Sequence, residues 1–429
     1  MDRVLILHYH EIWLKGGNKN YFLSRLIAAI KRATEGLPVG PLRFTSDRLI
    51  LEPQDESALP QIIARLKRVF GLAYIAVARA VPAELEAMSR VARELMDAAE
   101  PQTFAVRAKI AGGEFELNSM ELERALGQTI LDHLRARGST VKVKLTAPQI
   151  TCRVEIVNSQ ALIYTERVEG AGGLPAVTGG RLVALLSGGF DSGVAAFKMM
   201  RRGAHLTFAH FFSNPSESKG SSSPVVEEIV RVLTPYQFTS RLYLIPFEPV
   251  QRLIVAGAHQ SFRVLLYRRL MARMARTIAV AERALGLVTG DSVSQVASQT
   301  LHNLAAVDHG LGVPIYRPLA GDDKSEIVRM ARQIGTYTIC CEPFEDCCPR
   351  FMPRSPAIFS NAAQLDEAES VLDVEALVTL GLENTRVKDF KFEAGVVSAR
   401  DTMPHRYQKL LIRRREAHGE AAPPVHTQP

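Results

Sequence analysis

The chain has 429 residues, of which 47% are hydrophobic and 23% are charged, and its formal net charge at pH 7 is +7. This length exceeds what one hydrophobic core serves and predicts about two to four domains. No apolar run is long enough for a membrane span, and the first residues lack the basic and apolar regions of a secretory signal. We therefore expect a cytoplasmic protein without a membrane anchor. The positive net charge suits a polyanionic partner such as RNA.

The first part of the chain, residues 1–168, has an α+β pattern. Apolar and β-branched runs predict strands at 4–7, 48–52, 74–78, 103–109, 141–145, 151–157 and 161–166. Helical periodicity predicts helices at 21–34, 60–69, 82–98 and 119–137. The glycine-rich segment 169–176 is typical of a linker.

Beyond this linker the pattern changes to alternating apolar strands and helices. The predicted strands cover 182–186, 206–212, 242–245 and 285–288. The predicted helices cover 192–202, 224–234, 249–256, 260–283 and 324–334. This alternation predicts an open, mostly parallel sheet with helices on both faces. In such a sheet, ligands bind at the carboxyl ends of the strands.

A short motif at the end of the first of these strands is the most informative part of the sequence. It reads Ser187-Gly188-Gly189-Phe190-Asp191-Ser192 and precedes an apolar helix. Its glycines let backbone N–H groups approach a phosphate, and the start of the helix adds partial positive charge. Asp191 suits a Mg²⁺ ion carried by a nucleotide, and the two serines offer hydroxyl groups to phosphate oxygens.

The motif differs from other common phosphate-binding loops. It lacks the Gly-Lys-Ser/Thr of a Walker A loop and the third glycine of the dinucleotide fingerprint. It is similar to the PP-loop of enzymes that split ATP into AMP and pyrophosphate to activate an oxygen atom on a substrate. The alternative interpretation is an ordinary Gly-Ser turn in which Asp191 caps the helix. A second polar loop, Thr289–Thr300, also follows an apolar strand and is suited to hold a ribose or a base edge.

Ordered motifs over residues 1–390 resemble a single family. They are Glu11–Lys19, Thr103–Lys109 with Ser119–Leu122, Leu185–Val194, Gly290–Leu301, Arg317–Leu319 and Glu345–Cys348. With them the chain resembles the tRNA 4-thiouridine synthetases, the ThiI family, although Asp291 stands where the family motif has Glu.

The resemblance implies a division of the chain. An N-terminal ferredoxin-like domain would cover 1–60, a THUMP RNA-binding domain 61–168 and a PP-loop ATP pyrophosphatase domain 177–395. The remaining 396–429 would be a C-terminal extension whose end we expect to be disordered.

The resemblance also implies which residues bind ATP. The family's nucleotide contacts map onto Leu185, Leu186, His210, Phe211, Arg268, Gly290 and Gln299. Ser187, Gly188, Gly189 and Ser192 complete the predicted site, and Asp191 is the predicted catalytic carboxylate, with ATP and Mg²⁺ as cofactors and no metal ligands of the protein's own. Arg268 is suited to neutralise phosphate charge. There are alternatives to nucleotide binding for some of these residues. His210 would then be merely packed, and most of the arginines near Arg268 would lie on a solvated helix face.

Four of the five cysteines fall between residues 340 and 348. Such a cluster is unlike a secreted disulfide framework and indicates redox chemistry, sulfur transfer or a metal. Buried, inert cysteines and a metal or iron–sulfur site remain alternatives here. The fifth, Cys152, has the surroundings of a packing residue.

Sulfur transfer would explain why an ATP-splitting loop and a cysteine cluster occur in one chain. A uracil O4 is a poor leaving group, but after adenylation it leaves as part of AMP. A cysteine persulfide is then a suitable sulfur nucleophile. The family-matched pair is Cys347 and Cys348, with a slight preference for Cys348 as the carrier. Cys340 and Cys341 are further candidates for the thiol that resolves it.

The RNA-binding side is less sharply encoded. The predicted phosphate contacts are Arg107, Lys109, Lys142 and Lys144. The resemblance implies a tRNA uridine at the junction of acceptor stem and D-arm as the target, a cysteine desulfurase as persulfide donor, and a homodimer. Because no cysteine follows Cys348, we do not expect the rhodanese domain of longer family members. The resemblance associates the family with thiamine biosynthesis, and without that domain the sequence leaves a role in thiazole synthesis open.

Other functions remain open at this stage. One is a PP-loop tRNA thiolase that uses an iron–sulfur cluster. Another is an ATP pyrophosphatase acting on a small molecule, although Cys152, in a strand, offers no obvious glutaminase nucleophile. A third is a non-catalytic RNA-binding protein, which the intact loop Ser187–Ser192 argues against.

Overall fold

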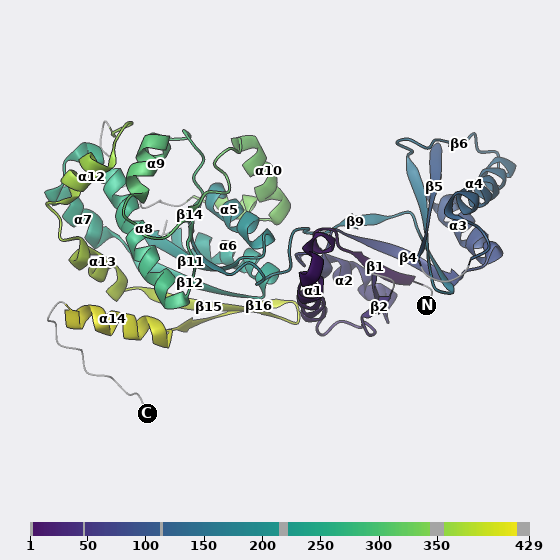
Figure 1. Ribbon diagram of the computed structural model, residues 1–429, viewed down its shortest axis with the longest axis horizontal. Helices are drawn as coiled ribbons and strands as arrows, with labels where there is room; N and C mark the ends of the chain where they lie inside the picture. The colour runs from purple at the N-terminus through teal and green to yellow at the C-terminus, as the bar shows by residue number, and fades with distance from the viewer. Residues whose placement is uncertain (1–2, 46–47, 112–114, 214–221, 344–355, 418–429) are drawn as a thin grey trace, which may run out of the picture. The chain divides into compact units, whose positions relative to one another are not determined.

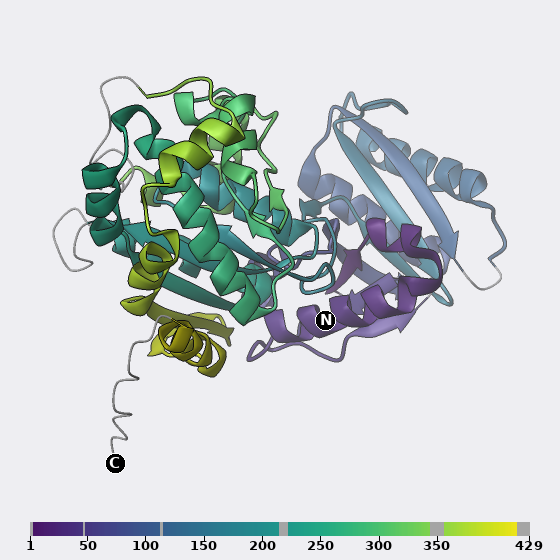
Figure 2. The ribbon, with the colours of Figure 1, turned by 60° about the vertical axis from the view of Figure 1, so that its left-hand side comes forward.

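The structure is a computed structural model that describes residues 3–45, 48–111, 115–213, 222–343 and 356–417. The chain forms two compact units, Met1–Leu174 and Pro175–Pro429 (Figures 1 and 2). Cys347, Cys348 and the end of the predicted C-terminal extension lie outside the described residues. No helix in the described ranges is long and apolar enough to cross a membrane.

The first unit is built on one twisted sheet. Its strands are β1 (Arg3–His8), β2 (Arg43–Thr45), β3 (Arg48–Leu51), β4 (Tyr74–Pro82), β5 (Thr103–Ala111), β6 (Lys142–Val143), β7 (Ile150–Val157), β8 (Gln160–Tyr164) and β9 (Arg167–Glu169). They lie in the order β2-β3-β1-β4-β8-β7-β5-β6, and β9 also pairs with β4. Because β4 pairs with both β1 and β8, one sheet runs through the two domains predicted at 1–60 and 61–168.

The helices of this unit cover the sheet through apolar faces. They are η1 (Glu11–Asn18), α1 (Lys19–Ala33), η2 (Glu56–Ala58), α2 (Leu59–Leu66), α3 (Leu85–Ala99) and α4 (Ser119–Ala136). Met88 of α3 and Leu126 of α4 pack with Phe104 and Val154 of the sheet in one buried cluster. The predicted helix start at Pro82 is wrong, because Pro82 pairs with Gln160 and ends β4. A proline fits at a strand end, where it interrupts no inner ladder.

The predicted linker is held by the first unit over part of its length. Gly170 N donates to Ala73 O at 2.9 Å, and Gly172 N donates to Leu72 O at 2.7 Å. A Cβ on Gly170 would lie 2.3 Å from Leu72 O, so only glycine allows this approach.

The second unit contains the predicted open sheet. Its strands are β10 (Arg181–Leu185), β11 (His205–Phe212), β12 (Thr239–Pro246), β13 (Leu287–Val288), β14 (Ile315–Tyr316), β15 (Arg386–Glu393) and β16 (Val396–Thr402). The order is β14-β13-β10-β11-β12-β15-β16, and the first five strands are parallel. The mostly parallel α/β sheet is therefore confirmed.

Helices cover both faces of this sheet (Figure 1). They are α5 (Phe190–Arg201), α6 (Ser222–Gln237), α7 (Glu248–Gly257), α8 (Arg263–Glu282), α9 (Leu301–Asp308), α10 (Lys324–Ile334), α11 (Tyr337–Cys340), α12 (Ala362–Glu369), α13 (Val374–Glu383) and α14 (His405–Ala417), with short turns η3 (Gln260–Phe262) and η4 (Ala297–Gln299). The largest core lies between β10–β12 and α7, α8 and α13. On the other face, α5 and α6 pack against β11.

The far edge of the sheet differs from the prediction. Strand β15 pairs antiparallel with β12 and forms a hairpin with β16. The boundary predicted at residue 395 falls in the turn of this hairpin, where Ala394 and Gly395 have positive φ. Residues 396–402 therefore belong to the sheet and not to a separate extension.

The strand order fixes where a ligand can bind. From β10 the chain continues to β11 and β12 on one side and returns to β13 on the other. Such a reversal opens a crevice outside the carboxyl ends of the two central strands. The loops that follow β10 and β13 are the two predicted from the sequence to hold a ligand.

Candidate functional site

The loop after β10 forms a closed turn at the start of α5. Ser187 N donates to Ser192 Oγ at 3.0 Å, and Ser192 Oγ donates back to Ser187 O at 3.1 Å. Gly189 is the N-cap of α5, so the first turn of the helix directs its N–H groups toward the crevice. This arrangement favours an anion at the mouth of the loop.

The loop after β13 packs directly on this turn. A Cβ on Gly290 would lie 2.6 Å from Ser192 N and 2.8 Å from the carbonyl carbon of Asp191. Any side chain here would push the two loops apart. Position 290 therefore requires glycine for a steric reason that is independent of any family motif.

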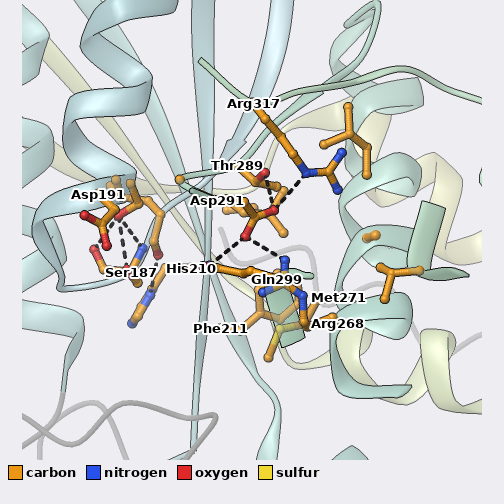
Figure 3. A pocket seen from close by; sticks show the side chains of 18 of the residues that line it. Ser187, Asp191, His210, Phe211, Arg268, Met271, Thr289, Asp291, Gln299 and Arg317 are labelled. Carbon is orange, nitrogen blue, oxygen red and sulfur yellow. Dashed lines mark hydrogen bonds and ion pairs between the residues drawn. The ribbon is translucent and has the colours of Figure 1, made fainter. Parts of the chain in front are cut away.

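Both loops line a cavity of about 340 Å³ at the carboxyl edge of the sheet (Figure 3). Its wall includes nine of the eleven predicted nucleotide contacts: Leu185, Leu186, Ser187, Ser192, His210, Phe211, Arg268, Gly290 and Gln299. The predicted catalytic Asp191 also lines it, whereas Gly188 and Gly189 do not. An apolar part is formed by Ala209, Met271, Ala272, Val307 and Ile315, together with the leucines and Phe211.

Asp291 is the centre of the polar network in this cavity. Its Oδ1 accepts from Arg268 Nη2 at 2.6 Å and from Gln299 Nε2 at 3.1 Å. Its Oδ2 accepts from Thr289 Oγ1 at 2.7 Å and from Arg317 Nε at 3.1 Å (Figure 3). Burial opposes ionisation, but Arg268 and the other donors together lower the pKa of Asp291, so the carboxylate is charged and only accepts hydrogen bonds.

Asp191 lies opposite this network and is held by a lysine. Lys324 Nζ, at the start of α10, contacts both carboxylate oxygens of Asp191 at 2.7 and 3.0 Å. Lys324 Nζ also lies over the ring of Phe190, 5.4 Å from the ring centroid. Sequence reasoning missed Lys324, whose only signal was its place at the start of a predicted helix.

His210 is a packed residue of the cavity wall. Its side chain is buried, with Nδ1 2.8 Å from Leu186 O and Nε2 2.8 Å from Ser222 Oγ. Because a carbonyl oxygen only accepts, Nδ1 donates to Leu186 O, while Nε2 and Ser222 Oγ share a second hydrogen bond. The ring thereby ties β11 to the loop after β10.

The described cysteines differ in their surroundings. Cys340 is buried, and burial raises its pKa to about 12, with further contributions from Cys341 and Asp191. Cys341 is exposed. The predicted catalytic Cys347 and Cys348 lie outside the described residues. Within the described ranges, no group of three or more His, Cys, Asp or Glu side chains is placed to hold a metal ion.

The first unit has its own polar cavity, of about 500 Å³. It is lined by aromatic and basic side chains that include His8, His10, Trp13, Tyr74, Arg107, Lys109, Arg153 and Arg167. Of the predicted RNA contacts, Arg107 and Lys109 lie in its wall, whereas Lys142 and Lys144 lie outside it and are exposed beside β6.

Aromatic rings in this cavity are stacked and covered by cations. Tyr74 lies between the ring of His8, at 4.2 Å, and the guanidinium of Arg167, at 4.3 Å. Lys19 Nζ lies 3.7 Å from the ring centroid of Trp13, whose side chain is 47% exposed. Sequence reasoning missed these aromatic residues; the tryptophan inside the motif Glu11–Lys19 was the available signal.

Comparison with known proteins places both units. Family models match for the ThiI ferredoxin-like domain over residues 4–76, the THUMP domain over 82–166 and the thiamine biosynthesis protein ThiI over 177–374. A probable tRNA sulfurtransferase of Moorella thermoacetica is 39% identical over 92% of this chain and 99% of its own length. A probable tRNA sulfurtransferase of Thermus thermophilus is 40% identical over 90% of this chain and 94% of its own length.

A solved structure of a 4-thiouridine synthetase–RNA complex with bound ATP is 33% identical, with a TM-score of 0.79 over 91% of this chain and all of that one. PH1313 from Pyrococcus horikoshii, 24% identical with a TM-score of 0.58, shares the fold over 78% of this chain and 99% of its own. The molecule thus joins ferredoxin-like and THUMP domains to a PP-loop domain. The chain belongs to the ThiI family, as its motifs indicated.

Proposed function

We propose that this protein is an ATP-dependent tRNA sulfurtransferase that converts a tRNA uridine into 4-thiouridine. One observation carries the proposal: the loop Ser187–Ser192, an apolar slot and the polar pair Arg268 and Gln299 share one cavity. The names of the relatives, and the ATP and RNA bound to a 33% identical neighbour, support the same activity.

The cavity suggests how ATP would bind. The apolar wall near Phe211, Met271 and Ile315 suits the adenine ring. The phosphates would then lie at the loop and the start of α5, where backbone N–H groups and the helix dipole favour negative charge. Arg268 lines the same cavity and can compensate charge that develops during transfer.

Mg²⁺ would enter this site with the nucleotide. Mg²⁺ is commonly held by one or two carboxylates together with substrate phosphates. Asp191 offers its two oxygens at the mouth of the loop, and the described residues provide no larger cluster of ligands. The donor set therefore fits an ion that arrives on the triphosphate, where it would neutralise phosphate charge. Lys324, which binds Asp191 in this structure, would then leave Asp191 and bind a phosphate oxygen.

The first chemical step would be adenylation of the uracil. The O4 atom attacks the α-phosphorus of ATP, the bond from the α-phosphorus to the oxygen that bridges to the β-phosphate breaks, and pyrophosphate leaves. The uracil N3 proton is lost to solvent in the same step. The product carries AMP on O4. The chain's residues contribute by aligning the phosphates and by stabilising charge on them.

The second step would exchange oxygen for sulfur. A persulfide on Cys348 or Cys347 attacks C4, and the C4–O4 bond breaks to release AMP. A second thiol then attacks the cysteine sulfur, which releases 4-thiouridine and leaves a disulfide that an external thiol must reduce. We propose a cysteine desulfurase as the source of the persulfide, and a cytoplasmic homodimer as the working form.

The first unit would hold the tRNA. Its cavity combines aromatic faces, on which unpaired bases can stack, with guanidinium and ammonium groups for phosphates. Trp13 and Tyr74 are the proposed stacking residues, and Arg107, Lys109, Lys142 and Lys144 the proposed phosphate contacts.

The proposal is tested by nucleoside mass spectrometry of tRNA after incubation with the protein, ATP, Mg²⁺, a cysteine desulfurase with cysteine as the source of persulfide sulfur, and a thiol reductant. We expect 4-thiouridine together with AMP. Replacement of Cys347 or Cys348 by Ser should permit AMP formation and prevent thiolation. ATP consumption without sulfur in any uridine would contradict the assignment.

A further inference from the structure

The side-chain amide of Gln299 has a fixed orientation. Its Nε2 donates to Asp291 Oδ1 at 3.1 Å. A carboxylate accepts and never donates, so the amide cannot be turned round without placing two acceptors against each other. Two arginines keep Asp291 charged, since Arg268 Nη2 and Arg317 Nε bind it at 2.6 and 3.1 Å. The position of Oε1 is therefore determined by Asp291.

This fixed oxygen has no partner among the residues that the structure describes. Within those residues Gln299 Oε1 is buried without a hydrogen-bond partner, and so is Arg268 Nε. Buried polar atoms in native proteins are nearly always satisfied, and an exception calls for an explanation. Both residues line the cavity, close to Phe211 and Met271 in the view of Figure 3. A ligand that brings a hydrogen-bond donor to this wall explains the unpaired oxygen.

We propose that Asp291 is a positioning residue that fixes Gln299 so that Oε1 selects a purine with an amino group at C6. The inference rests on the proposed function, because it assumes that a purine nucleotide enters this cavity. The 6-amino group of adenine donates to Oε1. A 6-oxo group, as in hypoxanthine or guanine, would place two acceptors together, and a site built for one hydrogen-bond partner rejects the other strongly.

Variants that change the orientation of the Gln299 amide distinguish a positioning role of Asp291 from a merely structural one. In Asp291→Asn the new side-chain amide can offer Gln299 either an oxygen or an N–H group. The Gln299 amide can then turn, so it can present an acceptor to adenine or a donor to a 6-oxopurine. In Asp291→Glu the carboxylate is retained, and this variant should keep the preference. Gln299→Met removes the acceptor while leaving a side chain of similar length.

The test compares ATP with ITP, which has an oxygen in place of the amino group at C6 and therefore carries a proton on N1. Binding is measured by calorimetry without tRNA, and AMP or IMP formation is measured with tRNA. We expect the unmodified protein and Asp291→Glu to prefer ATP by roughly 10- to 100-fold. Asp291→Asn and Gln299→Met should reduce that ratio at least tenfold. Gln295→Met, a change of the same kind at a neighbouring glutamine that contacts Asp191, should leave the ratio unchanged.

The outcomes separate this inference from the proposed function. An unchanged ATP to ITP ratio in Asp291→Asn and Gln299→Met would overturn the inference alone. The expected ratios in the binding experiment without any thiolation of tRNA would support the inference and contradict the proposed function. Failure of the protein to bind ATP at all would overturn both.

Discussion

Two aspartates lie in neighbouring segments of the cavity wall, and their surroundings suit them to different roles. Asp291 is 5% exposed and saturated by two arginines, a threonine and a glutamine, so it can organise these groups and has no capacity left for a metal ion. Asp191 contacts the exchangeable side chains of Lys324 and Gln295. At the residue scale, we therefore propose Asp191, and not Asp291, as the carboxylate that takes part in the chemistry.

Replacement of Asp191 by Ala should reduce AMP formation on tRNA about 100-fold or more, because charge on the transferring phosphate loses its partner. The measurement is AMP release in the presence of tRNA, with circular dichroism to confirm folding. Asp401→Ala removes an exposed carboxylate of the same unit and should leave the rate unchanged. AMP release at the original rate by Asp191→Ala would refute the role of this carboxylate.

The described cysteines should differ in reactivity with iodoacetamide. Burial raises the pKa of Cys340 and of Cys152 to about 12, so at pH 8 only about one in ten thousand of these thiols is a thiolate. Cys341 is exposed and should be modified first. Peptide mass spectrometry after a brief reaction tests this, with denatured protein as the control in which all three react. Equal labelling of Cys340 and Cys341 in the folded protein would be the contrary result.

At the scale of elements, the site depends on the contact between the loop after β13 and the start of α5. Gly290→Ala would place a Cβ 2.6 Å from Ser192 N, and backbone atoms there cannot move aside without separating the loops. We expect ATP binding to weaken about tenfold or more, measured by calorimetry. Gly321→Ala meets no atom within 4 Å and is the matched control. Equal ATP affinity of both variants would show that the two loops need not touch.

A buried ion pair joins four strands of the first unit. Glu155 of β7 contacts Arg48 of β3, His8 of β1 at 3.2 Å and Tyr164 of β8 at 2.7 Å. Burial alone would raise the pKa of Glu155, but His8, Arg48 and Tyr164 together lower it from 4.5 to about 2. Because the pKa in the folded state is depressed, this stabilisation is complete above about pH 4.5 and is lost as the pH falls toward 2.

We therefore expect the unfolding midpoint of the first unit to drop as the pH falls from about 4.5 toward 2. The fluorescence of Trp13, the chain's single tryptophan, follows this unfolding. Glu155→Gln should flatten this pH dependence and cost about 3–5 kcal/mol at pH 7, because buried Arg48 loses its counter-charge. Glu52→Gln, which breaks an exposed pair with Arg43, should cost less than about 1 kcal/mol. Unchanged pH dependence in Glu155→Gln would show that another group titrates.

The strongly periodic elements were predictable, and the short or edge elements were not. The strands predicted to begin at 182, 206 and 242 are mostly apolar because helices cover both of their faces. Strand β14 contains two residues, and its pairing with β13 depends on the rest of the sheet. Hairpin β15–β16 was missed because exposed, charged residues alternate along it and give no apolar run. The nucleotide loop was predictable since its glycines and serines are local.

The partners of the site residues were beyond sequence reasoning. Lys324 lies 133 residues from Asp191, and Arg317 lies 26 residues from Asp291. Only the fold brings such pairs together, and a lysine or arginine at a helix start or strand end has many possible roles. The aromatic cavity of the first unit was missed for the same reason, because Trp13, Tyr74 and Arg167 come from three separate segments.

At the scale of the molecule, the net charge of +7 accords with binding to a polyanion. Affinity for tRNA should fall steeply as salt rises, because each neutralised phosphate releases counterions. Arg107→Ala with Lys109→Ala should weaken binding and reduce the slope of log K against log salt by about 2. Lys31→Ala with Lys67→Ala removes the same charge from exposed positions outside the cavity and serves as the control. Equal slopes for the two double variants, measured by filter binding, would place the RNA elsewhere.

The most direct measurement of the central claim is the nucleoside composition of tRNA after one incubation with the protein, ATP, Mg²⁺, a cysteine desulfurase with cysteine, and a thiol reductant. The account predicts one uridine with sulfur at C4 for each AMP released, and neither product in Asp191→Ala. Sulfur in uridine without AMP release, or AMP release from Asp191→Ala, would contradict it.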